Sequence, residues 1–129
     1  MTFYYENLCH KLIGAFYDLY NELDFGYREK FYEDAAFKKL HEKGIKVERQ
    51  KSIKLRHKNK YITYRKIDFI IEDKLIIELK VGNRLLKKHF EQAHEYLVAL
   101  DLRLALLIMF TPHGVLVRRV VNDPNYEYK

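Results

Sequence analysis

The sequence predicts an α/β domain with a mixed central β-sheet flanked by helices, in the order ααβββαββ. Apolar residues recur at helical spacing in three segments, and they alternate or run together in five shorter segments. A helix-length segment separates the third strand from the fourth, which is long enough for a crossover between parallel strands. At 129 residues the chain fits one domain, 1–129, with its core at about 6–121 and a loose polar tail at 122–129.

Three segments are expected to be helical, because their apolar residues recur every three or four positions. The first covers about residues 5–23 and ends before Gly26. The second covers about residues 28–43, with Gly44 in the position just past its end. The third covers about residues 85–100 and supplies the expected crossover.

Five shorter segments are expected to form strands. The first, at about residues 45–56, alternates apolar and polar residues and carries many cations. Residues 65–80 contain two apolar strands on either side of a polar turn. The run 104–110 is continuously apolar, as in a buried strand, and the last strand is expected at about 115–120.

The pairing of the two strands in residues 65–80 follows from their apolar pattern. A two-residue turn at Glu72 and Asp73 would mix charged and apolar residues on each face. A register shifted by one residue makes one face wholly apolar and places Asp68 opposite Glu78. We therefore expect an odd-length loop centred on Asp73, or a bulge. The apolar pairs of this register are Ile67 with Leu79, Phe69 with Ile77, and Ile71 with Leu75.

Three charged residues interrupt these apolar strands, namely Asp68, Glu78 and Lys80. Charges in strand interiors are costly unless they are paired or bound to a metal. Two carboxylates on adjacent strands can hold Mg²⁺ through oxygen ligands, and a neighbouring ammonium can stabilise developing negative charge. The cluster therefore suits phosphodiester hydrolysis. A cross-strand salt bridge at the rim of the sheet is the alternative interpretation of the same spacing.

The charge balance favours a polyanionic partner. The formal net charge is +6 and the sequence pI is about 9.3, which indicates nucleic acid before membrane. The alternative for each surface cation is simple solvation. The residues expected to contact phosphates are Lys54, Arg56, Lys58, Lys60, Arg84, Lys87 and Lys88.

Several other classes of function are not expected. Cys9 is the only cysteine, which excludes an intrachain disulfide and a cysteine metal site. The longest apolar run, 104–110, is far too short to span a bilayer, and the first residues lack the regions of a signal peptide. We therefore expect a cytoplasmic protein without a membrane partner. Ser52 is the only serine and has no adjacent histidine, so a serine nucleophile is not expected.

These motifs resemble the PD-(D/E)XK nuclease superfamily. The resemblance rests on Asp68, then on Glu78 and Lys80 in a Glu-x-Lys motif on the neighbouring strand. More narrowly, residues 26–32, GYREKFY, match the GxxExxY motif that names one branch of the superfamily. The resemblance covers nearly the whole chain, about residues 6–121. The sequence departs from the superfamily's name at Ile67, where the name has proline.

The resemblance implies a restriction-endonuclease-like fold with a Mg²⁺-dependent phosphodiesterase centre, in which Mn²⁺ would substitute. Carried over by position, Asp68 and Glu78 would be metal ligands and Lys80 the catalytic lysine. Glu29 matches the acidic residue that the first-motif helix brings to the metal, although from its position alone it is a first-turn residue favoured by the helix dipole. Gln92 and Tyr96 match a QxxxY pattern, and would face the site or the substrate strand.

The resulting hypothesis is a Mg²⁺-dependent nuclease that acts on DNA or RNA. A non-catalytic module of the same fold, which binds nucleic acid or a protein partner, is the alternative. A junction-resolving endonuclease is a narrower enzymatic alternative, because such enzymes are also small, basic and built on these motifs, and a homodimer is then an open possibility.

Overall fold

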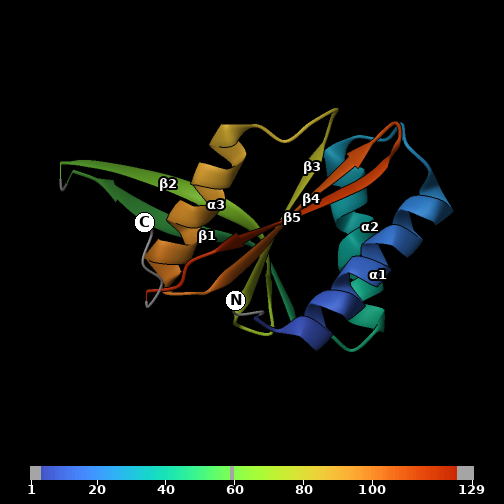
Figure 1. Cartoon of the computed structure of the whole chain (residues 1–129), viewed down its shortest axis with the longest axis horizontal. Helices are drawn as coiled ribbons and strands as arrows, with labels where there is room; N and C mark the ends of the chain where they lie inside the picture. Colours follow the sequence, from blue (N-terminus) through green and yellow to red (C-terminus); the bar gives the residue numbers. More distant parts are fainter. Residues whose placement is uncertain (1–3, 59, 125–129) are drawn as a thin grey trace.

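The computed structural model describes residues 4–58 and 60–124, and it is an α/β fold with a five-stranded mixed sheet (Figure 1). The predicted class and element order are both confirmed. The helices are α1 (Glu6–Leu23), α2 (Glu29–Glu42) and α3 (Lys87–Leu100). The strands are β1 (Val47–His57), β2 (Tyr61–Ile71), β3 (Leu75–Val81), β4 (Leu104–Thr111) and β5 (Gly114–Val121).

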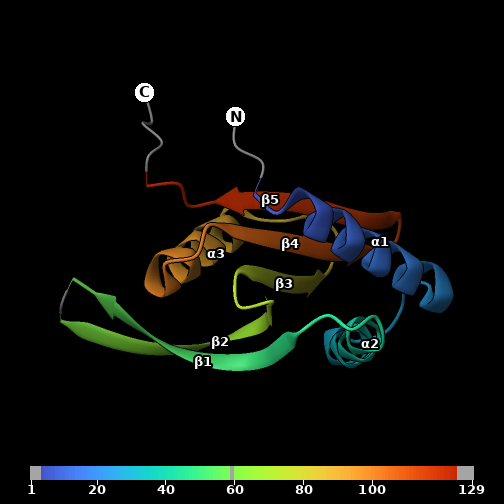
Figure 2. The ribbon, with the colours of Figure 1, turned by 90° about the horizontal axis from the view of Figure 1, so that it is seen from below.

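The strands lie in the order β1-β2-β3-β4-β5. Only β3 and β4 pair in parallel, and the other neighbours are antiparallel. Helix α3 provides the crossover between the two parallel strands, as predicted. Figures 1 and 2 show that α3 covers one face of the sheet, whereas α1 and α2 cover the other.

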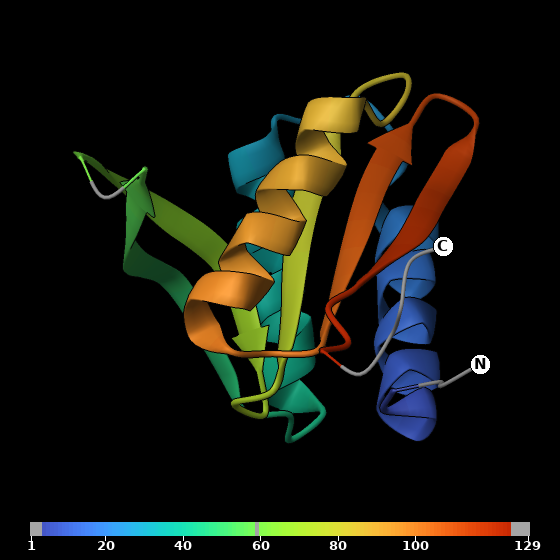
Figure 3. The ribbon, with the colours of Figure 1, turned by 60° about the vertical axis from the view of Figure 1, so that its left-hand side comes forward.

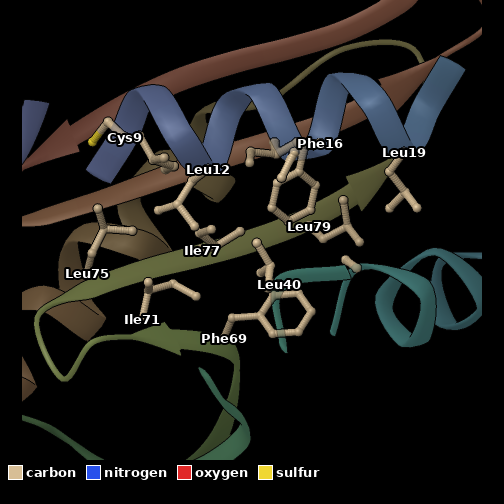
Figure 4. Close-up of a cluster of buried hydrophobic side chains, with 14 of the residues drawn as sticks. Cys9, Leu12, Phe16, Leu19, Leu40, Phe69, Ile71, Leu75, Ile77 and Leu79 are labelled. Atoms are coloured by element: carbon tan, nitrogen blue, oxygen red, sulfur yellow. The ribbon is translucent and has the colours of Figure 1, made fainter. Parts of the chain in front are cut away.

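The larger apolar core lies between the sheet and the pair α1 and α2 (Figure 4). Leu12 and Phe16 of α1 meet Leu40 of α2, and both helices pack on Phe69 and Ile77 of the sheet. These side chains are almost completely removed from water, so their burial is a main source of stability. Every residue of β4 is buried, as expected for a strand covered on both faces.

A second core lies on the α3 side, and it includes the outer part of the β1–β2 hairpin. Ile53, Leu55 and Ile67 of the hairpin are buried in one cluster with Ala93 and Leu97 of α3. Figure 3 shows the hairpin reaching past α3, away from the rest of the sheet. We call residues 51–67 of this hairpin the β1–β2 arm.

The register predicted between β2 and β3 is confirmed in its inner part. Ile71 pairs with Leu75 across a three-residue loop, and the ladder includes Phe69 with Ile77. The prediction that Ile67 faces Leu79 is wrong. The ladder ends at Phe69, Ile67 packs in the α3-side core, and Leu79 packs in the α1 and α2 core.

The start of the expected tail is anchored to the domain. The backbone N–H of Asn122 donates a hydrogen bond to the carbonyl of Arg103 (2.9 Å), and its side-chain amide donates to the carbonyl of Leu102 (3.1 Å). The end of that tail, residues 125–129, lies outside the described residues. Among the described residues, no helix is both long and apolar enough to cross a membrane.

Candidate active site

Strands β2 and β3 separate at the point where Asp68 faces Glu78. The backbone N–H of Asp68 donates to Oε2 of Glu78 (2.8 Å), and the backbone N–H of Leu79 donates to Oδ2 of Asp68 (2.9 Å). The two carboxylates thus occupy places that backbone carbonyls would fill in a regular antiparallel ladder. This exchange explains why the ladder stops and why Ile67 turns away from Leu79.

The two carboxylates lie in a poorly solvated position. Glu78 is only 3% exposed, and burial together with the charge of Asp68 raises its pKa to about 8. Burial also raises the pKa of Asp68. Both shifts mean that the protein disfavours two negative charges at this point unless a cation is present.

Lys80 and Glu29 complete a group of four charged residues. Burial raises the pKa of Glu29, and the ammonium of Lys80 opposes that rise. Lys80 acts in the same sense on Asp68 and Glu78. Glu29 lies in the first turn of α2, and its carboxylate interacts with the backbone N–H of Val81 at the end of β3. The structure therefore brings the four sequence-predicted residues into one electrostatic cluster.

The donor set fits a hard divalent cation. Asp68 and Glu78 offer only oxygen atoms, and Mg²⁺ is typically held by one or two carboxylates with water and substrate oxygens. Within residues 4–58 and 60–124, no three histidine, cysteine, aspartate or glutamate side chains are arranged to hold a metal by themselves. The pair Asp68 and Glu78 therefore fits the ion, and direct ligation by Glu29 stays a prediction.

The sequence alone did not point to a polar relay behind Asp68. The side-chain amide of Gln50 on β1 donates to Oε1 of Glu33 (2.7 Å) and to Oδ1 of Asp68 (3.4 Å). Glu33 is only 7% exposed, and it also accepts a hydrogen bond from Arg49 (3.1 Å). One signal was present: Glu33 follows Glu29 by one helical turn, so both lie on the same side of α2.

The backbone of Gln50 is in the left-handed region, with φ at 53°. It lies between two regular pairs of β1 and β2, Arg49 with Phe69 and Lys51 with Ile67, at the level of Asp68. A residue other than glycine in this conformation costs about 1–2 kcal/mol. The surrounding contacts of Gln50 thus maintain a strained residue directly beside the candidate metal ligand.

Replacing Gln50 separates this strain from the side-chain contact. We expect Gln50→Gly to melt at a higher temperature than Gln50→Ala by about 2–5 °C, because glycine removes the backbone strain and both variants lack the amide. Both should bind Mn²⁺ more weakly than wild type by calorimetry, because the Gln50 amide no longer holds Oδ1 of Asp68 in position for the ion. Ser52→Ala, at an exposed position of the same strand, is the control. Equal melting of the glycine and alanine variants would contradict the strain, and unchanged Mn²⁺ affinity would contradict the relay.

Helix α3 contributes the far wall of the site. Tyr96 is buried, and burial together with the charge of Glu78 raises the pKa of its hydroxyl to about 12. Gln92 is half-buried one turn earlier on α3, and its contact with substrate stays a prediction. His89 was not among the site residues predicted from the sequence. Burial and the charge of Lys80 lower the pKa of its imidazole, and its Nδ1 accepts a hydrogen bond from the backbone N–H of Leu86 (3.0 Å).

The predicted phosphate contacts form two groups, and all of them are exposed. Lys87 is ion-paired with Glu91 (3.6 Å). The charge of Lys88, like that of Lys80, lowers the pKa of His89. The group near the start of α3 is Arg84, Lys87 and Lys88, and the group on the β1–β2 arm is Lys54, Arg56, Lys58 and Lys60.

Comparison with known proteins agrees with this fold. A family model described as the PD-(D/E)XK nuclease superfamily matches residues 6–120. Among curated proteins, none matches this sequence significantly. The confirmed restriction-endonuclease-like fold is shared with two crystal structures at 17% and 13% sequence identity, which supports a likeness of fold alone.

The first of these structures is SSO0001, with a TM-score of 0.61 over 74% of this chain and 50% of that protein. The second is an alkaline exonuclease (LHK-Exo) from Laribacter hongkongensis, with a TM-score of 0.54 over 73% of this chain and 56% of that protein. This chain thus spans about half the length of either structure.

Proposed function

Because this chain belongs to the PD-(D/E)XK nuclease superfamily, we propose that it is a Mg²⁺-dependent nuclease that hydrolyses phosphodiester bonds of DNA, with RNA as the alternative substrate. One observation carries the proposal: Asp68 and Glu78 each accept a hydrogen bond from the backbone of the other's strand, which brings a half-buried and a buried carboxylate together between β2 and β3. Residues 26–32 further support a place in the GxxExxY branch, with Glu29 as its motif residue.

In this proposal each charged residue has a separate role. Asp68 and Glu78 would hold the divalent cation, which would supply polarisation of the phosphoryl oxygen and a lower pKa for the attacking water. Lys80 orients the attacking water and stabilises the negative charge that develops on the phosphoryl oxygens. We expect Tyr96, which is buried in the α3-side core, to limit the access of bulk water to the carboxylate pair.

The buried carboxylate pair favours catalysis over the alternative of a binding-only module. Two like charges in a poorly solvated position destabilise the metal-free fold. In a module that only binds nucleic acid, these two carboxylates would weaken binding, because carboxylates repel phosphates. The superfamily comprises nucleases, and its match over residues 6–120 supports the same preference. Cleavage of a junction in preference to other substrates would support the narrower junction-resolving proposal.

Purified protein is therefore expected to cut nucleic acid in the presence of Mg²⁺ or Mn²⁺ and to stop when a chelator is added. Plasmid, single-stranded and branched DNA, and RNA of matched length, should be compared by gel electrophoresis. The chelator lane controls for contaminating metal-independent nucleases. If the protein cuts none of the four substrates with either metal, the nuclease proposal is contradicted and the alternative of a binding-only module is favoured.

A further inference from the structure

The net positive charge of this protein is concentrated on the β1–β2 arm. Residues 51–67 contain seven lysines and arginines and no aspartate or glutamate. The rest of the chain carries 17 lysines and arginines against 18 carboxylates, so it is close to neutral. The arm projects past α3 (Figure 3). Its positive charges therefore attract phosphate groups to this one part of the molecule.

Exposed apolar side chains lie among these cations. Tyr61, Ile62 and Tyr64 are 64%, 47% and 67% exposed, and Ile62 and Tyr64 share one face of the hairpin. Lys54 lies directly opposite Tyr64 across the hairpin, and Arg56 lies directly opposite Ile62. Directly opposite residues share one face of an antiparallel pair, so cations and apolar groups are interleaved there.

This exposed face leads to the carboxylate pair. Tyr64 and Lys66 lie on the side of β2 opposite the buried Ile67, and Asp68 follows two residues after Lys66, where the alternation of the strand changes. Tyr64 is four residues from Asp68, or about 13 Å along an extended strand at about 3.3 Å per residue. A strand of nucleic acid that lies along the arm is thereby directed toward the site.

We propose that the exposed face of the β1–β2 arm binds single-stranded nucleic acid, with Tyr64 stacked on an unpaired base and Lys54, Arg56 and Lys66 on its phosphates. The proposal rests on the proposed function, because it assigns the form of the substrate that reaches Asp68 and Glu78. An exposed aromatic side chain can stack on an unpaired base. In a duplex the bases are already stacked on one another, so their faces are not accessible to the side chain. The exposed ring of Tyr64 therefore favours a single strand over a duplex.

The neighbouring groove between the arm and α3 is a poorer place for this strand. Lys54, Leu55 and Arg56 form one wall of that groove, but Glu91 and Glu95 are on the other wall. Carboxylates there repel phosphates, whereas the outer face between residues 51 and 67 has none. The outer face of the arm is therefore the surface whose charge complements nucleic acid.

Binding without cleavage tests the stacking contact. Fluorescence anisotropy in chelator should show that wild type binds labelled oligothymidine more tightly than a duplex of the same length. Tyr64→Ala should weaken oligothymidine binding by at least about fivefold, Tyr64→Phe should bind like wild type, and duplex binding should change little. Tyr17→Ala removes a tyrosine that is 44% exposed on α1, and it is the matched control. Unchanged oligothymidine affinity of Tyr64→Ala, or an equal loss for duplex, would overturn the proposal.

The salt dependence of binding tests the cations on the same face. A triple variant, Lys54→Gln, Arg56→Gln and Lys66→Gln, should make the slope of log affinity against log salt shallower by about 2, because three phosphate contacts are lost. The same charge is removed from exposed positions of α1, α2 and the residue after α2 by Lys11→Gln, Lys38→Gln and Lys43→Gln, and that control should keep the wild-type slope. Equal slopes in the two triple variants would overturn the arm as the binding surface.

These outcomes are distinguishable from failure of the nuclease proposal. A protein that cuts nothing but whose oligothymidine binding depends on Tyr64 supports the arm and contradicts only the catalytic role. A protein that cuts normally but whose binding is indifferent to Tyr64 overturns only the arm.

Discussion

Lys80→Ala and Asp68→Asn are each expected to reduce Mg²⁺-dependent cleavage by at least about a hundredfold, while leaving most nucleic-acid binding intact. Lys80 acts mainly on charge that develops in the transition state, and Asp68 supplies half of the carboxylate pair. The fold should persist, because an asparagine oxygen can still accept the hydrogen bond from the backbone of Leu79. Initial cleavage rates and oligonucleotide affinity, measured on the same preparations, check this expectation.

Two exposed residues provide matched controls for these variants. Lys38→Ala and Asp18→Asn make the same chemical changes on α2 and α1, at exposed residues outside the candidate site, and both should cut like wild type. Circular dichroism should show that all four variants are folded. Wild-type rates in both Lys80→Ala and Asp68→Asn would remove the basis for the nuclease proposal.

Without metal, Glu78→Gln is expected to become more stable than wild type as the pH rises above about 6. The carboxyl of Glu78 has a pKa near 4.5 when unfolded and about 8 when folded, so the folded protein favours its protonated form. Its contribution is present in full below the unfolded pKa and is lost as pH rises through the folded pKa, a change of a few kcal/mol. Glutamine resembles the protonated acid and does not titrate. Melting temperatures in chelator between about pH 5 and 9 measure the difference.

Divalent cations should reverse this order at alkaline pH. Mg²⁺ binds the ionised pair and stabilises wild type, whereas Glu78→Gln has lost one of the two carboxylates and should gain little. Glu42→Gln, an exposed residue at the end of α2, should follow wild type in both series. Parallel pH profiles for wild type and Glu78→Gln in chelator would show that the buried pair does not control stability.

Much of the fold follows from local patterns that the sequence displays directly. The three-residue loop after Ile71 was predictable because only one register collects the apolar residues of β2 and β3 on one face. The failure at Ile67 has a physical cause. Alternation records which residues are polar, but it does not show that carboxylate oxygens of Asp68 and Glu78 will replace backbone carbonyls as hydrogen-bond acceptors.

Some residues of the candidate site could likewise be predicted from the sequence, and others could not. Asp68, Glu78 and Lys80 lie within one hairpin, so local register was enough to bring them together. Gln50 and Glu33 come from β1 and α2, and their approach depends on how those elements pack. A glutamine in the left-handed region has no sequence signature, because nothing in its neighbours requires that conformation.

The order of strands leaves two unpaired edges, and both are positively charged. β1 and β5 are the outermost strands, and an exposed edge is a template on which a second copy can add its own strand. β1 carries Arg49, Lys51, Lys54 and Arg56, and β5 carries Arg118 and Arg119. An incoming copy would therefore meet like charge at either edge. The lysines and arginines of β1 thus also protect the protein against edge-to-edge aggregation, and removing them for a binding experiment weakens that protection.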